Sequence, residues 1–586
     1  MLGEITPREL TEIVRGRIGA APLPEDYDGQ VHQRAMAAMA RQGLRERIEA
    51  ALDDARPVEA LRYTLFRHFR QTGNRSLCDG FLHVRSRQVD LAAMAVYLGM
   101  DEKAPYLQDL LWTECESTWW TMPSHEYFEA PIDLRVAMNG FHYARIARLL
   151  SNRIGGEVAD RIYSEVRRRV LDEYLAPGRD YWWGRTTNNW NAVCSGAIGL
   201  AAMLIEDDPD RLAEILRRVL TSLPIFLSGF TDDGGCTEGA GYWRFGFQWY
   251  VLFAAGLHAF TDGRVNIMAG EKIERICRYP LAVWLAPGQD LPFADAHGAF
   301  MPSWLAVRIN RFHDVPELFG LCKLTDEGQL QIDSLTDLLC FDDRTFQPSH
   351  DAADYYLPEL AVAKVRAATM TVGCKAGHNH EHHNHNDVGN FLVHRGGTFF
   401  VTDLGAPVYS ARTFGRHRYE SIFCNSLGHN VPVINGHGQP AGAAARGTMR
   451  CEGLNGGATR TVTIEMAGAY AEPTLSALTR RIEVPAGQER VALTDEFTFC
   501  QPPTALREHF MATLPAKVRD GGRSVEIVSD CDGTAVLSAE AAGRFEVQEL
   551  AAESAESRTG ELVRRIAFVP DRLDKAMRLR FTVTFE

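Results

Sequence analysis

Residues 377–391 of the chain read GHNHEHHNHNDVGNF, and residues 391–403 continue as FLVHRGGTFFVTD. The second stretch places two apolar runs on either side of a Gly-Gly pair, a pattern that predicts a β-hairpin. The first stretch holds five of the nineteen histidines within eight residues, which neither an amphipathic helix nor a strand requires. A solvated histidine-rich loop is the plain alternative. Because the tract runs directly into the hairpin, we interpret it as part of a binding site.

The histidine tract and the hairpin together predict a metal site. His383 and His385 are two residues apart, so in an extended segment their side chains project to the same face. Asp403 ends the returning strand of the hairpin, and His429 lies in a further segment with strand-like flanks. Two histidines and one aspartate on neighbouring strands supply nitrogen and oxygen donors and leave a fourth position open. Zn²⁺ accepts such a donor set.

The chain after Pro348 has the period-two alternation of β-strands, interrupted by Gly and Pro clusters. This pattern predicts an antiparallel β region of sandwich type. The predicted strands include residues 361–367, 460–467, 477–484, 491–499 and 579–585.

The chain before about residue 345 has apolar residues at helical spacing and no convincing strand. Many sequential helices with short loops fit a toroid of helical hairpins. We therefore predict an α+β multidomain protein, with an N-terminal (α/α) toroid at 1–350 and an antiparallel β-sandwich at 351–586. The longer predicted helices span residues 134–151, 158–171, 191–205, 211–223, 242–260 and 273–285, the last broken at Pro280.

Composition limits the classes of function. At 586 residues the chain is too long for one core, so two or three domains are expected. A content of 45% hydrophobic and 24% charged residues excludes a mainly disordered or fibrous chain. The net charge of −14 argues against general nucleic-acid binding. It permits an anionic substrate, because a local basic cleft can act within an acidic surface.

The cysteines and the N-terminus bear on the compartment. Twelve cysteines are scattered without a C-x-x-C pair, which indicates free thiols in a reducing compartment. The first ten residues show no signal-peptide pattern, and no segment reaches about 18 uninterrupted apolar residues. We expect a cytoplasmic protein without a membrane span. A periplasmic or secreted location stays open if a leader has been removed.

Two polar stretches stand out in the helical half. Residues 182–194 read WWGRTTNNWNAVC, with three asparagines and an arginine among three tryptophans at a predicted helix start. Ordinary helix capping explains one asparagine but not three, and aromatic rings with amides also suit a sugar. Residues 232–244 read DDGGCTEGAGYWR, a Gly-rich loop that opens a helix. Its plain alternative is a tight loop capped by Thr237, with Tyr242 as a core aromatic.

Two weaker stretches complete the candidates. Residues 292–298 read PFADAHG and are interpreted as a loop. Residues 412–419 read RTFGRHRY, a basic loop in an acidic protein that follows the predicted metal hairpin. A solvated surface and a contact to an anionic ligand are both open for this loop.

Taken together, these stretches resemble the heparinase II/III-like polysaccharide lyases, which include alginate and glycosaminoglycan lyases. The resemblance covers the chain from about residue 130 to 586, and it implies an incomplete α/α toroid followed by an antiparallel β-sandwich. Five motifs carry it in order: NNWN at 188–191, EGAGY at 238–242, HNHNDVG at 383–389, DLG at 403–405 and SLGHN at 426–430.

The resemblance implies β-elimination at a uronic acid, which breaks the bond from C4 to the glycosidic oxygen and leaves a 4,5-unsaturated sugar. The enzyme must neutralise the carboxylate, remove the C5 proton and protonate the leaving oxygen. By resemblance Asn191 neutralises the carboxylate, with Asn189 or Arg185 assisting. Tyr242 is the catalytic tyrosine that donates to the leaving oxygen, and it acts as a base if deprotonated. His383 is the base for the other C5 epimer.

The resemblance also implies the metal ligands His385, Asp403 and His429. The metal would be Zn²⁺, or Mn²⁺ as the alternative, and would be mainly structural, because it fixes the hairpin that presents His383.

The remaining candidates are a second phenol and the substrate contacts. Tyr409 is predicted to be catalytic, with Tyr419 as the alternative. One departure from the family matters, because several relatives carry a histidine directly after the charge-neutralising asparagine, where this chain has Trp190 or Ala192. His378, His380 and His382 are treated as loop residues. Substrate binding is predicted for Arg185, Asn189, Trp190, Glu238, Arg244, Arg412 and Arg416.

Three rival functions stay open. An α/α-toroid glycoside hydrolase needs two carboxylates across the scissile bond. A non-catalytic carbohydrate-binding or metal-storage protein and a metallohydrolase that uses zinc directly are the others. The hydrolase carboxylates would come from Asp232, Asp233, Glu238 and Asp295.

The expected partner is an anionic polysaccharide or oligosaccharide, with no nucleic acid and no membrane. Homo-oligomerisation is undecided. The sequence does not choose among heparan sulfate, hyaluronan, chondroitin sulfate and alginate, nor between endo and exo action.

Overall fold

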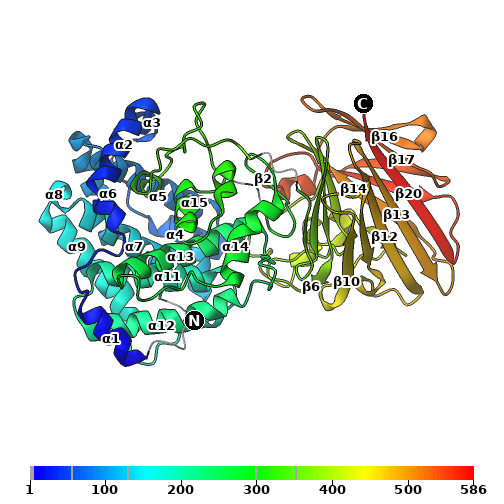
Figure 1. The fold of residues 1–586 in the computed structure, drawn as a ribbon. Helices are drawn as coiled ribbons and strands as arrows, with labels where there is room; N and C mark the ends of the chain where they lie inside the picture. Colours follow the sequence, from blue (N-terminus) through cyan, green and yellow to red (C-terminus); the bar gives the residue numbers. More distant parts are fainter. Residues whose placement is uncertain (1–5, 55–56, 129–130, 297, 299, 350–352) are drawn as a thin grey trace. The chain divides into compact units, whose positions relative to one another are not determined.

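The computed structural model describes residues 6–54, 57–128, 131–296, 298, 300–349 and 353–586. Its contacts group into a helical unit and a β unit (Figure 1). The helical unit comprises Met1–Gly229, Tyr242–Cys277 and Phe300–Ser349. The β unit comprises Phe230–Gly241, Arg278–Ala299 and His350–Glu586. Two short segments from the first half of the chain therefore pack with the strands.

The helical unit is built from helices joined by short loops, as the apolar spacing predicts. Side-chain oxygens cap several of these helices, for example Asp133 at α7 and Asn188 at α11, and so satisfy backbone N–H groups that the first turn leaves open. The α-helices are α1 Pro7–Arg15, α2 Gly29–Arg41, α3 Leu44–Ala51, α4 Tyr63–Thr72, α5 Ser76–Tyr97, α6 Ala104–Glu116, α7 Leu134–Leu149, α8 Ser151–Ile154, α9 Gly156–Val166, α10 Asp172–Leu175, α11 Asn189–Ile205, α12 Pro209–Leu227, α13 Ala240–Phe260, α14 Glu271–Val283, α15 Ser303–Asn310 and α16 Leu335–Leu339.

Two local predictions in the helical half are wrong. Helix α14 continues through Pro280 instead of breaking there. The proline removes the N–H that would bond to the carbonyl of Ile276, and the indole of Trp243 donates to that carbonyl at 2.9 Å. This replacement bond keeps the helix intact. A short hairpin, β1 Trp284–Ala286 with β2 Gln289–Asp290, lies where no strand was expected, because strands of three and two residues leave too short a pattern.

The β unit holds three larger antiparallel sheets. The first sheet has the order β15-β16-β17-β20-β13-β12-β11-β10-β6, the second β18-β19-β14-β9 and the third β3-β4-β5-β7-β8. The strands are β3 Tyr355–Leu357, β4 Val362–Ala367, β5 Met370–Lys375, β6 Gly377–Asn379, β7 Phe391–Arg395, β8 Thr398–Val401, β9 Pro432–Ile434, β10 Gly442–Glu452, β11 Thr459–Glu465, β12 Leu475–Pro485, β13 Arg490–Phe499, β14 Leu506–Ala512, β15 Ala516–Arg519, β16 Ser524–Ser529, β17 Gly533–Ala539, β18 Gly543–Glu549, β19 Arg564–Pro570 and β20 Ala576–Phe585.

One apolar core joins these sheets. Val365 of β4, Ile482 of β12 and Phe510 of β14 belong to the same buried cluster, although they come from three different sheets. Apolar and polar residues alternate along the strands because one face of each strand packs on this core. The five predicted strands and the hairpin formed by β7 and β8 are confirmed, with the hairpin turn at Gly396 and Gly397.

The segment around Asp295 is held close to two other loops of the β unit. Gly239 has φ +88°, and a Cβ there would lie 2.6 Å from the Cβ of Ala296. Gly405 has φ +61°, and a Cβ there would lie 3.1 Å from the carbonyl oxygen of Ala296. Glycine is therefore required on both sides. These contacts bring the loops that carry Glu238 and Asp403 against the segment that carries Asp295.

All twelve cysteines are free, as the sequence predicts. None of the helices in the described ranges combines the length and the apolarity that a bilayer span needs.

Candidate functional site

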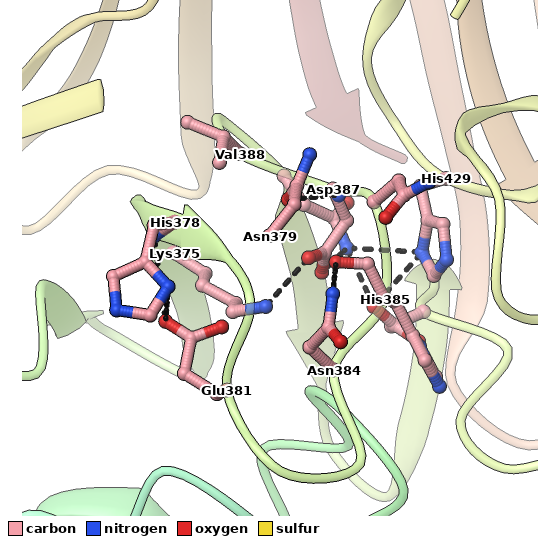
Figure 2. Close-up of polar contacts among 12 residues, drawn as sticks. Lys375, His378, Asn379, Glu381, Asn384, His385, Asp387, Val388 and His429 are labelled. Atoms are coloured by element: carbon pink, nitrogen blue, oxygen red, sulfur yellow. Dashed lines mark hydrogen bonds and ion pairs between the residues drawn. The ribbon is translucent and has the colours of Figure 1, made fainter. Parts of the chain in front are cut away.

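The predicted metal ligands come together in the β unit. His385 lies in the loop after β6, Asp403 lies two residues after β8, and His429 precedes β9. All three are buried, and one ligand atom of each lies within 4.8 Å of the others. The imidazole centroids of His385 and His429 lie 5.1 Å apart, and both residues are labelled in Figure 2. Three separate segments of the chain therefore meet at one donor cluster.

The two histidines each have one nitrogen engaged and one nitrogen available. His385 Nε2 lies 3.0 Å from Asp295 Oδ1, and His429 Nδ1 lies 3.3 Å from Asp403 Oδ2. Within the described part of the chain, the buried atoms His385 Nδ1 and His429 Nε2 have no hydrogen-bond partner. A buried nitrogen without a partner is costly, and a metal ion would satisfy both lone pairs. The cluster therefore fits a divalent metal with two nitrogen ligands and one oxygen ligand.

Burial and charge act on these histidines in opposite ways. Burial is the main cause that lowers the pKa of His385, which favours the neutral ligand form. Burial also lowers the pKa of His429, but the carboxylate of Asp403 outweighs it and raises that pKa above its ordinary value. A metal ion bound at His429 Nε2 would displace a proton held there.

A buried polar network orients Asp403. The amide of Asn390 donates to Asp403 Oδ2 at 2.5 Å and to Asp387 Oδ2 at 3.4 Å. Asp387 in turn pairs with Lys375 at 2.5 Å (Figure 2). The same figure shows His378 with Glu381 away from the donor cluster, consistent with a loop role for His378.

His383 lies beside this cluster and contacts Asp295. Its Nδ1 lies 2.6 Å from Asp295 Oδ2, and its Nε2 lies 3.7 Å from Glu238 Oε2. The expectation of an extended segment is wrong, because His383 has φ 57° and lies in a turn. The turn still directs His383 and His385 to one carboxylate, because both rings reach Asp295.

Asp295 is the centre of the second half of this cluster. Its side chain is fully buried, and Tyr409 donates its hydroxyl to Oδ2 at 2.9 Å. Arg418 donates to Oδ1 at 3.0 Å. Burial alone raises the pKa of Asp295, but hydrogen bonds from His383 and His385 and the charge of Arg418 outweigh it, so the pKa lies well below its usual range. Asp295 is therefore an ionised carboxylate that accepts four hydrogen bonds.

Glu238 is a buried carboxyl group with a raised pKa. Its side chain is 6% exposed, and Oε2 has no hydrogen-bond partner among the described residues. Burial raises its pKa to about 7, against the opposing charge of His383. Near neutral pH, Glu238 can therefore hold or release a proton next to His383 Nε2.

The basic loop of residues 412–419 contributes an aromatic side chain as well as charges. Phe414 is 55% exposed, and its ring centroid lies 6.0 Å from that of His383. Arg412 is half-exposed and pairs with Glu420 and Glu556, so an anion would have to compete with those carboxylates. Arg416 is exposed and donates to His417. Tyr419, the alternative phenol, donates to Asn384 Oδ1 at 2.7 Å.

Asn191 of the helical unit is placed in the core. Its side chain is 0% exposed, and its amide donates to the carbonyls of Thr186 at 2.9 Å and Ser222 at 3.0 Å. Its oxygen accepts from the hydroxyl of Ser222 at 2.7 Å. These bonds fasten the start of α11 to α12. Because both ends of the amide are engaged, this placement argues against a substrate contact by Asn191.

Asn189 differs from Asn191 in its hydrogen bonding. It is the first residue of α11, and within the described ranges no side-chain hydrogen bond forms at its amide. The rings of Trp190 and Trp182 lie with their centroids 5.0 Å apart and their planes tilted by 44°. Asn189 is itself buried, at 5% exposed, but of the two asparagines in this helix it is the one whose amide is not held by described hydrogen bonds.

The other predicted substrate contacts of the helical unit lie on α13 and η5. Tyr242 is half-buried in the first turn of α13, and Arg244 donates to the carbonyl of Phe300 at 3.5 Å. Arg185 ends the short helix η5 Trp182–Arg185 and pairs with Asp180 on the surface.

Sequence reasoning did not predict the contacts that four further residues make at or near the candidate site. Asp295 lies in a stretch interpreted as a loop, and His297 of that stretch lies outside the described residues. Arg418 and Phe414 belong to the basic loop, but only Arg412 and Arg416 of that loop were selected. In the helical unit, the ring centroids of His125 and Trp190 lie 4.6 Å apart, and His125 Nδ1 lies 2.8 Å from Asp133 Oδ2. No local motif signals such partners, because each contact joins residues far apart in sequence or of common type.

Comparisons with known proteins found one matching family model and several solved structures with a similar fold. A model of the heparinase II/III-like C-terminal domain matches residues 352–574. A heparinase III structure is similar, with 14% identity over 86% of this chain and 76% of that chain and a TM-score of 0.59. Heparan sulfate lyase HepC from Pedobacter heparinus has 12% identity over 99% of this chain and 88% of that chain, with a TM-score of 0.57.

A third similar structure is the chondroitin AC lyase of Streptomyces coelicolor A3, solved in complex with chondroitin sulphate. It has 11% identity over 99% of this chain and 82% of that chain, with a TM-score of 0.54. A search of curated protein sequences found no match. The similarity confirms the predicted fold class, a helical toroid followed by an antiparallel β-sandwich. Residues 352–574 belong to the heparinase II/III-like family.

Proposed function

We propose that this protein is a polysaccharide lyase that cleaves uronic-acid polymers by β-elimination. One observation carries the proposal: His383 is half-buried, anchored through Nδ1 on an ionised aspartate, and directly beside a cluster that fits a metal. A base for the C5 proton needs a fixed ring with one basic nitrogen. The family of the β unit and the fold of the similar lyases support this reaction class.

The reaction runs in one balanced sequence. His383 removes the C5 proton of the uronate, and the electron pair of that C–H bond forms the C4–C5 double bond. The bond from C4 to the glycosidic oxygen breaks, and the hydroxyl of Tyr242 protonates the departing oxygen. No water is consumed. For the opposite C5 epimer, Tyr242 in its deprotonated form takes the C5 proton instead and then gives that proton to the departing oxygen.

The substrate carboxylate must be neutralised before the C5 proton becomes acidic. We assign this role to Asn189 rather than Asn191, because three hydrogen bonds to Thr186 and Ser222 engage the buried amide of Asn191. A single amide donor aimed at a developing enediolate contributes about 3 kcal/mol in comparable oxyanion sites. Tyr409, predicted from the resemblance as a catalytic phenol, is proposed here as a positioning residue that acts through its hydrogen bond to Asp295.

The residues His385, Asp403 and His429 would hold the metal, with Zn²⁺ proposed and Mn²⁺ as the alternative. When bound, the metal would lock three loops of the β unit together and would not need to contact the substrate. His383 lies two residues before His385, so a bound metal would also restrict the motion of the His383 ring.

The proposed substrate is an anionic polysaccharide or oligosaccharide. Similar structures are named for heparan sulfate and for chondroitin, so we propose a glycosaminoglycan first and alginate as the alternative. An exposed phenylalanine beside His383 offers an apolar face for a sugar ring.

A glycoside hydrolase is the second candidate, because Glu238 and Asp295 form a carboxyl pair with pKa values moved in opposite directions. A protonated acid and an ionised partner are what hydrolysis requires. Asp295, however, is fully buried and accepts from four donors. It therefore cannot reach a sugar, and the geometry favours the lyase.

The test is a panel of uronate polymers followed by ultraviolet absorbance. We expect absorbance from the conjugated double bond to rise with one substrate class. Tyr242→Phe should abolish the rise, and His383→Ala should abolish it for one uronate epimer. Absence of any rise, with reducing ends still produced, would replace the lyase by the hydrolase.

A further inference from the structure

We propose that Asp295 is a positioning residue that sets the tautomers of two histidines at once. It holds His383 with Nδ1 protonated and Nε2 as the basic nitrogen, and it holds His385 with Nδ1 as the nitrogen that would bind a metal held by Asp403 and His429. This inference rests on the proposed role of His383 as a base.

The hydrogen-bond count at Asp295 carries the argument. Oδ2 lies 2.6 Å from His383 Nδ1 and 2.9 Å from the Tyr409 hydroxyl, and Oδ1 lies 3.0 Å from both His385 Nε2 and Arg418 Nη2. An ionised carboxylate only accepts hydrogen bonds, so every group that faces it donates. The hydrogens of both imidazoles therefore point at Asp295, and their lone pairs point away.

The consequence differs for the two rings. His383 is left with Nε2 as its basic nitrogen, on the side of Glu238. His385 is left with Nδ1 as its basic nitrogen, which is the buried atom that no described group satisfies. A carboxylate behind a metal-bound histidine is a common way to fix the ring and strengthen the ligand. In this protein the same carboxylate, Asp295, also accepts a hydrogen bond from the proposed base, His383.

The segment that carries Asp295 has little freedom to move. Its side chain is fully buried, and Gly239 and Gly405 let two loops approach the neighbouring Ala296 closely. The charge of Arg418 balances the carboxylate, because Arg418 is permanently protonated. The order of the metal loop and the orientation of His383 thus depend on one buried group.

An asparagine at position 295 makes the inference testable, because it keeps the shape and replaces one oxygen by NH₂. Arg418 can only donate, so the amide oxygen must face Arg418 and the NH₂ must face His383 and Tyr409. His383 then accepts at Nδ1 and carries its hydrogen on Nε2. This is the tautomer that cannot act as a base from Nε2. In Ser-His-Asp proteases, the change of the triad aspartate to asparagine inverts the histidine tautomer in the same way.

The experiment compares wild type, Asp295→Asn and Asp354→Asn, all saturated with Zn²⁺. Asp354 is a matched control, because it is a buried carboxylate of the β unit that accepts from Arg366, Asn455 and Arg460 and contacts no histidine among the described residues. Long-range proton–nitrogen spectra of ¹⁵N-histidine-labelled protein report the tautomer of His383, assigned with His383→Gln. Metal affinity is measured by chelator competition, and kcat and KM on the responsive polymer.

We expect Asp295→Asn to move the His383 hydrogen from Nδ1 to Nε2, to weaken metal binding by about 10- to 100-fold, and to lower kcat by about 100-fold or more with little change in KM. Asp354→Asn should lose stability but keep the His383 tautomer and kcat within about twofold of wild type. An Nδ1 hydrogen retained in Asp295→Asn, or a kcat unchanged at saturating metal, would overturn the proposal. The tautomer needs no substrate, so failure of the lyase assignment would not obscure it.

Discussion

Glu238 shows how one residue can oppose stability and serve function. Burial raises its pKa from 4.5 to about 7, so the folded protein binds its proton more tightly than the unfolded chain does. Stability from this group is therefore complete below pH 4.5 and declines as pH rises toward 7. Proteins keep such groups at sites where the proton has a use.

We predict that Glu238→Gln stabilises the protein at pH 8 by about 1 to 3 kcal/mol, because the variant no longer buries an unpaired charge. The gain should vanish at pH 4, where wild-type Glu238 is protonated. Denaturant unfolding of both proteins at the two pH values measures it. Equal stability of wild type and Glu238→Gln at pH 8 would show that folding does not raise the pKa of Glu238.

Of the two asparagines at the start of α11, we expect Asn191 to stabilise the fold and Asn189 to bind the substrate. Asn191→Ala should destabilise the protein by about 2 to 4 kcal/mol, because it leaves buried partners such as Ser222 unsatisfied. Asn189→Ala should change stability by less than about 1 kcal/mol and should lower kcat by about 100-fold, by loss of an oxyanion donor. Thermal unfolding and kinetics on the same preparations test both. The reverse pattern would return the catalytic role to Asn191.

The motif around residues 188–191 shows where sequence reasoning stops at the residue scale. The pattern indicates an amide-rich helix start, and the structure confirms a helix that begins at Asn189. Which asparagine points to the core depends on a carbonyl of α12, 31 residues later in the chain, and no local pattern encodes that contact. Asp295 was considered only as a hydrolase carboxylate, and its contacts to the histidines were missed for the same reason, because its four partners lie between 88 and 123 residues away.

At the scale of elements, the candidate metal cluster joins three loops that hydrogen bonds also connect, for example from Ser426 to the carbonyl of Asn386 and from Asn430 to the carbonyl of Thr402. His385 follows β6, Asp403 follows β8 and His429 precedes β9. A bound metal would add to these links by satisfying two buried nitrogens, His385 Nδ1 and His429 Nε2, that have no partner among the described residues. The hairpin was predictable because its apolar alternation and Gly-Gly turn are local, whereas the positive φ of His383 was not.

We predict that chelation lowers the melting temperature of the protein and that Zn²⁺ restores it, because a metal that binds only the folded state stabilises it by mass action. A His429→Gln variant should melt low and should not respond to chelator or metal. Calorimetry with metal analysis measures both effects. A melting temperature indifferent to chelation in fully loaded wild type would contradict a structural metal.

At the scale of the whole molecule, the net charge of −14 matters for a polyanionic substrate. Like-charged partners repel at long range, and this repulsion acts over about 30 Å at 10 mM salt but about 10 Å at 100 mM salt. Positive groups such as Arg416 act only locally. The net negative charge of the whole protein therefore slows its encounter with a polyanion, and recognition depends on the groups at the site itself.

We predict that kcat/KM for the polymer rises as salt increases from about 10 to 100 mM, while kcat stays constant. A short oligosaccharide with fewer charges serves as the control and should show a weaker rise. A steady fall of kcat/KM over this range would show instead that a basic surface steers the substrate.

The overall architecture was predictable because it depends on periodicity over hundreds of residues. Helical spacing in the first half and alternation in the second half gave the two fold types, and long elements such as α11 and β13 match their predicted positions closely. The assignment of residues 230–241 and 278–299 to the β unit was not predictable, because their packing partners lie far along the chain.

Elimination can be measured most directly as the number of double bonds formed for each new reducing end. Ultraviolet absorbance counts the first, and a reducing-sugar assay counts the second, on the same digest of the responsive polymer. Elimination requires one double bond for every new end, and we expect both signals to be lost together in Tyr242→Phe. New ends without matching absorbance would contradict elimination and would identify hydrolysis.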